Sequence, residues 1–216
     1  MKQINIKRSS DKNLIILFAG WAMDINPFRN MMSCNKNYMI CYDYSDLNFD
    51  IEKIKEYNDI RIIGWSMGVW AAAYIIDKWN IEYSQAIAIN GTLTPISDES
   101  GIPTSVYMGT LNTLTDKNLI KFFRRMCYGR DAFQQFLTIT PKRFLKDIKE
   151  ELEFMAIHTK IPLNNNIKWS KIIVGKNDLI FPYENQLNAW KNKKLEHIEL
   201  QNIAHFDFNL FCELLK

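Results

Sequence analysis

The sequence predicts an α/β protein with one mostly parallel sheet that carries helices on both faces. Apolar runs of strand length alternate along the chain with longer segments of helical spacing. Strands that alternate with helices indicate βαβ crossovers, which give a mostly parallel sheet covered on both faces. At 216 residues with 47% hydrophobic content, the chain is long enough to form one domain with a sizeable core.

The elements follow from these patterns in chain order. Residues 3–8 alternate polar and apolar side chains and are predicted to form an antiparallel edge strand. The other predicted strands span residues 14–20, 38–44, 60–66, 85–91, 171–178 and 197–202. The predicted helices between and after them span residues 28–32, 51–57, 67–79, 184–193 and 206–215.

One long insertion interrupts the alternation between residues 92 and 169. It opens with turn-forming residues and continues with helical patterns at 115–128, 130–138 and 141–160, the last beginning at Pro141. We expect a helical cap over the carboxyl edge of the sheet, where ligands bind in open α/β folds. The predicted division is a core of residues 1–94 and 165–216 and a cap of residues 95–164. An insertion with no role in ligand binding is the alternative.

Composition and charge exclude several classes of protein. A net charge of +3 is too mild to indicate nucleic-acid binding, and no apolar run approaches the length of a membrane span. The polar N-terminal segment lacks the apolar core of a secretion signal, so we expect a cytoplasmic protein. Four widely spaced cysteines predict reduced structural thiols, with neither a disulfide framework nor a metal site.

Residues 64–68 read GWSMG and fit the G-x-S-x-G pattern of a nucleophile elbow. In such an elbow a tight turn between a strand and a helix exposes the serine above the sheet. The context supports this interpretation, because a buried strand pattern precedes Ser66 and a helix rich in small residues follows it. We therefore predict that Ser66 is a nucleophile. A tight glycine turn with a chance serine is the alternative.

A serine nucleophile needs a base, and that base is usually a histidine oriented by a carboxylate. Among the three histidines, His205 follows the last predicted strand, whereas His158 lies in the cap and His197 inside a strand pattern. Asp178 ends another predicted strand, and Asp207 is its competitor. The order Ser66, Asp178, His205 is the chain order expected of this type of elbow.

An oxyanion needs two N–H donors close to the nucleophile. The backbone N–H of Met67, at the start of the helix after Ser66, is the first predicted donor. The second is the backbone N–H of Trp21, in the loop FAGWAMD after an early strand, where Gly20 frees the backbone to turn. Trp21 could instead be an ordinary core aromatic residue.

Several motifs together resemble one enzyme family. They are FAGWAMD, GWSMG, AINGTL followed by GIP, FFRRM, GKND and AHF. In combination they are similar to the short α/β-hydrolases that act as pimeloyl-acyl-carrier-protein methyl ester carboxylesterases in biotin synthesis. The resemblance covers nearly the whole chain. It implies an α/β-hydrolase fold, a triad of Ser66, Asp178 and His205, no cofactor, and pimeloyl-acyl carrier protein and methanol as products.

The predicted cap is locally basic. Between residues 115 and 149 the acidic residues are Asp116, Asp131 and Asp147, and the basic ones are Lys117, Lys121, Arg124, Arg125, Arg130, Lys142, Arg143, Lys146 and Lys149. Acyl carrier proteins are acidic, so this surface could guide a carrier to the pocket. Arg124, Arg125 and Arg143 are the predicted contacts for the carrier and its phosphopantetheine, because arginine can bind phosphate through two N–H groups. A solvated helix face is the alternative, supported by the acidic residues at 150, 151 and 153.

Two other functions remain open from the sequence. The same triad could act on a different acyl ester or thioester, because fold and triad do not select a substrate. The chain could also be a non-catalytic binding module that retains the elbow as scaffold. A monomer is expected.

Overall fold

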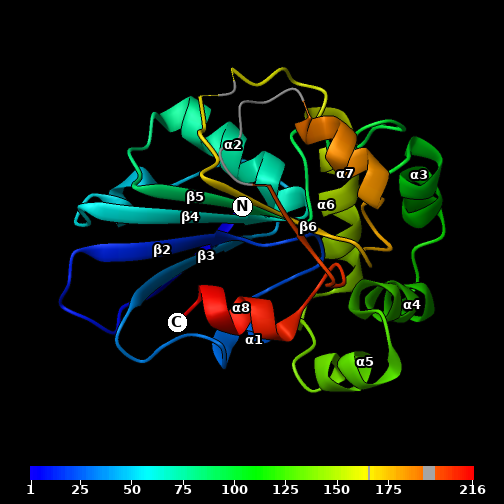
Figure 1. The fold of residues 1–216 in the computed structure, drawn as a ribbon, viewed down its shortest axis with the longest axis horizontal. Coiled ribbons are helices and arrows are strands. Elements are labelled where there is room, and N and C mark those ends of the chain that lie inside the picture. The colour runs from blue at the N-terminus through cyan, green and yellow to red at the C-terminus, as the bar shows by residue number, and fades with distance from the viewer. Residues whose placement is uncertain (165, 192–197) are drawn as a thin grey trace.

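The computed structural model describes residues 1–164, 166–191 and 198–216, and it has the predicted α/β-hydrolase architecture (Figure 1). Within these residues the sheet has seven strands in the order β1-β3-β2-β4-β5-β6-β7. Their bounds are β1 Lys2–Ile6, β2 Asn13–Phe18, β3 Asn37–Tyr42, β4 Asp59–Trp65, β5 Gln85–Ile89, β6 Lys171–Gly175 and β7 Ile198–Gln201. β1 pairs with β3 in antiparallel fashion, as predicted, and the other pairs are parallel.

Helices cover both faces of the sheet (Figure 1). α2 and α7 lie on one face, and α1 and α8 lie on the other. Their bounds are α1 Asn26–Arg29, α2 Met67–Trp79, α7 Tyr183–Trp190 and α8 Phe208–Leu214. The helix expected at residues 51–57 is shorter, a 3-10 turn η1 at Ile51–Ile54. Side chains of the central strands β2, β3, β4 and β5 are almost all buried, because both faces of a parallel sheet are covered.

In the described residues between β5 and β6 there are four helices, which lie together at one end of the sheet (Figure 1). They are α3 Thr104–Asn112, α4 Asp116–Cys127, α5 Arg130–Leu137 and α6 Leu145–His158. The structure adds α3, which the sequence did not predict. α6 begins at Leu145 and not at Pro141, with Phe144 as the residue before its first turn. The exact limits of the cap, residues 95 and 164, stay a prediction.

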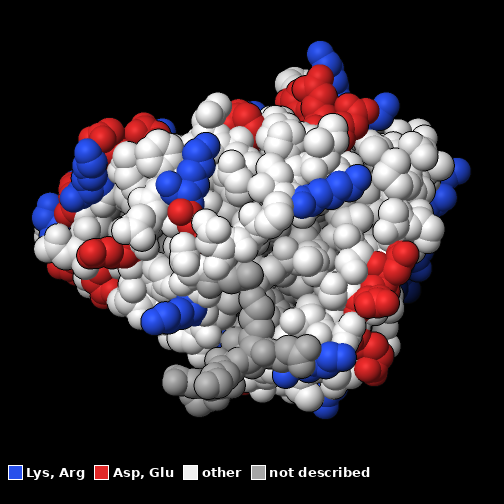
Figure 2. Space-filling view, turned by 90° about the horizontal axis from the view of Figure 1, so that it is seen from above, with Lys and Arg blue, Asp and Glu red and all other residues white. Residues whose placement is uncertain are grey.

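The surface carries charges of both signs. Figure 2 shows the face covered by α2 and α7, where positive and negative side chains are scattered among uncharged ones. None of the helices in the described ranges combines the length and the apolar character needed to cross a bilayer. The four cysteines, Cys34, Cys41, Cys127 and Cys212, are free thiols.

Candidate active site

Ser66 lies in a sharp turn between the end of β4 and the start of α2. Its φ of 59° and ψ of −128° are unusual for a residue with a side chain, as expected at a nucleophile elbow. Both flanking glycines are required. A Cβ atom at Gly68 would lie 2.1 Å from the carbonyl oxygen of Phe18, and one at Gly64 would lie 2.9 Å from the Cα of Val69. The first turn of α2 therefore packs directly on the backbone of β2.

Replacing Gly68 with alanine should destabilise the fold strongly, because the new methyl group meets backbone that cannot rotate away. We expect a loss of about 3 kcal/mol or more in the free energy of unfolding, at the upper end of overpacking effects. Gly109→Ala in α3 is the matched control, since a Cβ there meets nothing within 4 Å. It should add about 0.5–1 kcal/mol through helix propensity. Urea unfolding of both variants measures this, and equal stabilities would contradict the close packing at Gly68.

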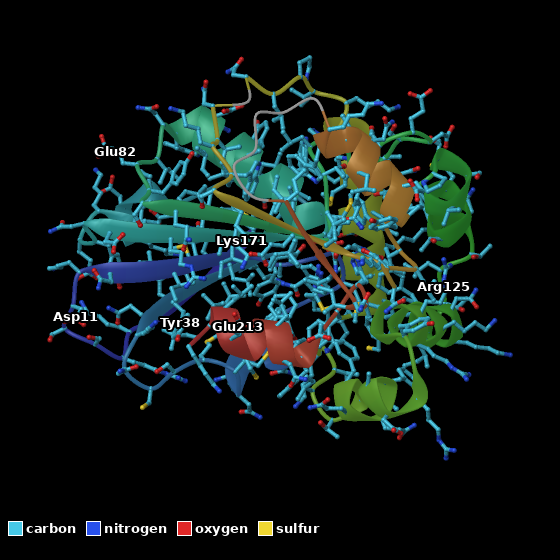
Figure 3. The ribbon with its side chains drawn as sticks, in the orientation of Figure 1. Asp11, Tyr38, Glu82, Arg125, Lys171 and Glu213 are labelled. Carbon is cyan, nitrogen blue, oxygen red and sulfur yellow. The ribbon has the colours of Figure 1, made fainter. Side chains whose placement is uncertain are left out.

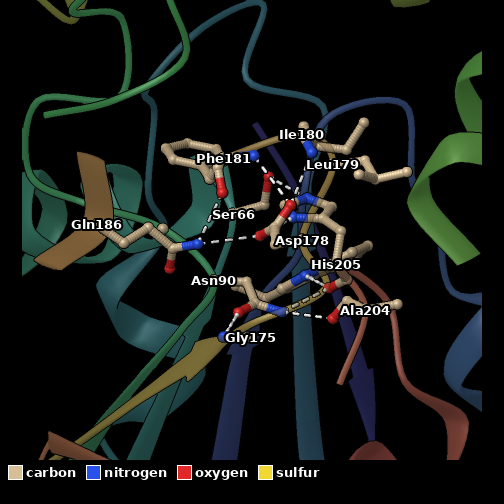
Figure 4. Close-up of polar contacts among 12 residues, drawn as sticks. Ser66, Asn90, Gly175, Asp178, Leu179, Ile180, Phe181, Gln186, Ala204 and His205 are labelled. Carbon is tan, nitrogen blue, oxygen red and sulfur yellow. Dashed lines mark hydrogen bonds and ion pairs between the residues drawn. The ribbon is translucent and has the colours of Figure 1, made fainter. Parts of the chain in front are cut away.

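The structure brings Ser66, His205 and Asp178 into one hydrogen-bonded chain (Figure 4). The Oγ of Ser66 lies 2.9 Å from Nε2 of His205, and Nδ1 of His205 lies 2.8 Å from Oδ2 of Asp178. Asp178 follows β6, and His205 lies in the loop between β7 and α8. All three side chains are buried, with His205 only 1% exposed. This arrangement can deprotonate the serine hydroxyl and hold the resulting imidazolium.

In the part of the chain that the structure describes, the donors to the carboxylate of Asp178 are all N–H groups (Figure 4). Its Oδ1 accepts from the backbone of Ile180 at 2.7 Å and of Phe181 at 2.9 Å. Its Oδ2 accepts from His205 and, at 3.1 Å, from Nε2 of Gln186, a fully buried side chain of α7. These bonds fix the plane of the carboxylate, and therefore the imidazole that it orients. Sequence reasoning missed Gln186, because no local pattern marks it.

Asn90 fixes the loop that carries His205. Its Nδ2 donates to the carbonyl oxygens of Ala204, at 2.7 Å, and His205, at 3.1 Å. Its Oδ1 accepts from the backbone N–H of Gly175 at 2.7 Å (Figure 4). The indole N–H of Trp65 donates to the same His205 carbonyl at 2.8 Å. A polar residue directly after β5 was the available signal for Asn90, since that position lies at the carboxyl edge of the sheet.

The competing residues lie elsewhere. Asp207 caps α8 by accepting a hydrogen bond from the backbone N–H of Leu210 at 2.9 Å. His158 lies at the end of α6, where its ring stacks on Phe154. His197 lies outside the described residues.

The two predicted oxyanion donors border Ser66. Met67 opens α2, and Trp21 follows Gly20, where an added Cβ would lie 3.1 Å from the Cβ of Ser66. Within the described part of the chain, neither backbone N–H has a hydrogen-bond acceptor. The Trp21 side chain is also buried. Its Nε1 donates to the carbonyl oxygen of Ile148 at 2.9 Å, and its ring packs against Phe122 in a T-shaped arrangement. Trp21 is therefore both an interior aromatic residue and a wall of the site.

A small, mainly apolar cleft of about 40 Å³ opens above Ser66, between the sheet and the cap. Side chains of the cap and of the loop after β6 line it with Ser66, Trp21 and Met67. They are Ile102, Val106, Tyr107, Thr110, Phe122, Arg125, Leu152 and Ile180. Across the described ranges, no three His, Cys, Asp or Glu side chains gather where they could hold a metal ion.

The predicted carrier contacts separate into two groups. Arg124 and Arg125 are exposed on α4, and Arg125 borders the cleft while donating to the carbonyl of Leu179 at 2.8 Å (Figure 3). Arg143 does not join them, because its side chain is only 4% exposed and pairs with Asp43 and Glu151. The structure thus corrects the surface role predicted for Arg143, and Glu151 faces inward rather than solvent.

The outer face of α6 fits the alternative of a solvated helix surface. Lys146 lies 3.6 Å from Glu150, and Lys149 lies 3.7 Å from Glu153, at the spacing of one helical turn. Exposed pairs of this kind contribute little stability. The local charge of this part of the cap is therefore partly balanced.

Comparison with known proteins agrees with the fold and shows the family. The sequence model of a family described as "Pimeloyl-ACP methyl esterase BioG" matches residues 1–214. The chain is also 42% identical over 205 residues to a malonyl-[acyl-carrier protein] O-methyltransferase of Bacteroides fragilis (strain 638R). That match covers 94% of this chain but 41% of the longer protein, whose name describes methyl transfer.

Solved structures of BioG and of an esterase-related protein have the same fold as this chain. BioG from Haemophilus influenzae superposes with a TM-score of 0.85 at 33% identity, covering 98% of this chain and 97% of that one. A lipase-esterase related protein from Clostridium acetobutylicum shares the fold, with a TM-score of 0.70 at 16% identity over 99% and 97% of the two chains. The chain therefore belongs to the BioG family of pimeloyl-ACP methyl esterases.

Proposed function

We propose that the protein is a serine carboxylesterase that hydrolyses the methyl ester of pimeloyl-acyl carrier protein, releasing pimeloyl-acyl carrier protein and methanol in biotin synthesis. The observation that carries the proposal is the hydrogen-bonded chain of Ser66, His205 and Asp178 beneath an apolar cleft. Membership in the BioG family supports the choice of substrate. The free thiols are compatible with a role in the reducing cytoplasm.

The proposed reaction has two halves. His205 removes the proton of Ser66 as its Oγ attacks the ester carbonyl, while Asp178 stabilises the imidazolium. The N–H groups of Trp21 and Met67 stabilise the tetrahedral oxyanion, and His205 returns the proton to the departing methoxy group. His205 then deprotonates a water that attacks the acyl-serine carbonyl, and it returns that proton to the Oγ of Ser66 as the acyl bond breaks and the free carboxylic acid leaves.

The lining of the cleft suits the uncharged ester better than the acid. Phe122, Val106 and Ile180 are among its apolar walls, and they can pack against the methylenes of a pimeloyl chain. The product carries a carboxylate that these apolar walls cannot solvate, and Arg125 is the charged side chain of the lining that can pair with it.

The deciding experiment is hydrolysis of pimeloyl-acyl carrier protein methyl ester by the purified protein, beside a free short-chain methyl ester. Faster loss of the methyl group from the carrier-bound substrate supports the proposal. Cleavage of free esters with no turnover of the carrier ester would leave a serine hydrolase but remove this substrate. No hydrolysis of either ester would favour a non-catalytic binding module.

Reversing the charge of Arg124 and Arg125 should weaken action on the carrier-bound ester. We expect kcat/KM to fall about tenfold or more at low salt, because an acidic carrier loses its electrostatic guidance. Hydrolysis of a free ester should fall less, because Arg125 also borders the cleft, and Arg124→Glu alone should leave it nearly unchanged. The matched control is Lys146→Glu with Lys149→Glu on the outer face of α6, which should leave both reactions nearly unchanged. Equal losses on carrier and free esters would contradict a docking role for α4.

A further inference from the structure

The loop after β2 passes against the nucleophile in a conformation that needs support. Gly20 packs on Ser66, and Trp21 lies between Gly20 and Ala22. Ala22 has a φ of 65°, in the left-handed region that alanine rarely adopts. The direction of the Trp21 backbone N–H depends on this turn. Contacts that hold residues 21 to 23 therefore bear directly on the site.

Glu151 of α6 makes the central contact. Its side chain has no exposed surface, and its Oε2 accepts a hydrogen bond from the backbone N–H of Ala22 at 3.3 Å. Its Oε1 accepts another from the backbone N–H of Tyr44, just after β3, at 3.0 Å. One buried carboxylate therefore joins the cap to two loops at the carboxyl edge of the sheet.

Arg143 supplies the opposing charge. Its Nη1 lies 2.6 Å from Oε2 of Glu151 and 3.4 Å from the carbonyl oxygen of Met23, and its Nη2 lies 2.9 Å from Oδ1 of Asp43. Burial raises the pKa of Glu151, and the guanidinium acts against that shift. A carboxylate buried without this partner would be costly.

The same helix also holds Trp21 itself, since the indole Nε1 donates to the carbonyl of Ile148 one turn before Glu151. Three consecutive residues of the loop are thus attached to α6 and Arg143: Trp21 by its side chain, Ala22 by its N–H and Met23 by its carbonyl. We propose that Glu151, paired with Arg143, is a positioning residue that sets the Trp21 N–H toward the oxyanion. The proposal rests on the proposed function, because it concerns the same Ser66 site.

Glu151→Gln tests the proposal with little change of shape. An amide has one acceptor oxygen, whereas the carboxylate serves Ala22, Tyr44 and Arg143 with two. We expect kcat for p-nitrophenyl acetate to fall by roughly 10- to 100-fold, up to the effect of losing one oxyanion donor, with KM within about threefold. Amide hydrogen exchange in residues 19–24 should accelerate while residues 63–70 keep their protection. The matched control, Glu153→Gln on the exposed face of α6, should change none of these values.

A second variant keeps the result interpretable if Glu151→Gln folds poorly. Arg143→Lys retains the charge but loses the fork that reaches Glu151, Met23 and Asp43 together, so an intermediate fall in kcat is expected. Two results for Glu151→Gln would overturn the proposal: unchanged amide hydrogen exchange in residues 19–24, or faster exchange there with unchanged kcat. Either result would mean that Glu151 and Arg143 form a structural ion pair only. If the unmodified protein hydrolysed no ester, the proposed function would fail. The exchange measurement would still show whether Glu151 holds the loop.

Discussion

Replacement of Ser66 by alanine should lower ester hydrolysis by roughly 10,000-fold or more, because the covalent route is lost while the oxyanion donors remain. The buried hydrogen bond between Ser66 and His205 is the physical reason for expecting so large an effect. Turnover of p-nitrophenyl acetate and labelling by a fluorophosphonate probe both measure it. The fold should survive, since alanine adds no atom to the tight turn.

Ser84→Ala is the control for this prediction. Ser84 lies on the surface before β5, where its hydroxyl donates to the carbonyl oxygen of Ile60 at 3.3 Å. Activity and labelling should remain those of the unmodified protein. If Ser66→Ala hydrolysed esters at a rate comparable to that of the unmodified protein, the proposed mechanism would be excluded.

Asp178→Asn should reduce kcat by roughly 10,000-fold, although it changes a single atom. Both oxygens of Asp178 face N–H donors, so an amide nitrogen conflicts with its neighbours in either orientation. Placed beside His205, the amide donates to Nδ1 and forces the proton onto Nε2. The imidazole then has no free lone pair to accept the proton of Ser66. Steady-state kinetics on a free ester measure the loss, and KM should change far less than kcat.

Asp207→Asn is the matched control, because Asp207 is the other carboxylate close to His205 in the sequence. Asparagine caps a helix about as well as aspartate, so α8 should keep its first turn and activity should stay within about threefold. A large fall in kcat for Asp207→Asn, with a small fall for Asp178→Asn, would show that Asp207 and not Asp178 orients His205.

Much of the fold and of the site geometry follows from local sequence patterns. Buried parallel strands are recognisable as apolar runs, and residues that end them must meet at the carboxyl edge of the sheet. That rule, together with the G-x-S-x-G pattern and the expected chain order, indicated Ser66, Asp178 and His205, which the structure brings within hydrogen-bonding distance. Their catalytic roles stay a prediction that the variants above can test.

The features that local patterns did not predict depend on contacts between segments that are distant in the sequence. In the sequence, Arg143 is indistinguishable from the surface cations near it. In the structure it is buried against Asp43 and Glu151, and no local sequence pattern predicts either partner. The sequence did not predict α3, because few of its side chains are buried and a clear helical pattern of apolar residues is therefore absent. Only Tyr107 and Leu111 are buried along it, and the Tyr107 hydroxyl donates to Leu152 of α6.

The wide separation of the site residues along the chain has a consequence for how the protein folds. His205 is 139 residues from Ser66, and it reaches Ser66 only after β6 and β7 have joined the sheet beside β5. Contacts of such long sequence separation form slowly, because the intervening chain must first be ordered. During refolding, helical circular dichroism should return early and esterase activity last. Recovered activity would then report completion of the whole sheet.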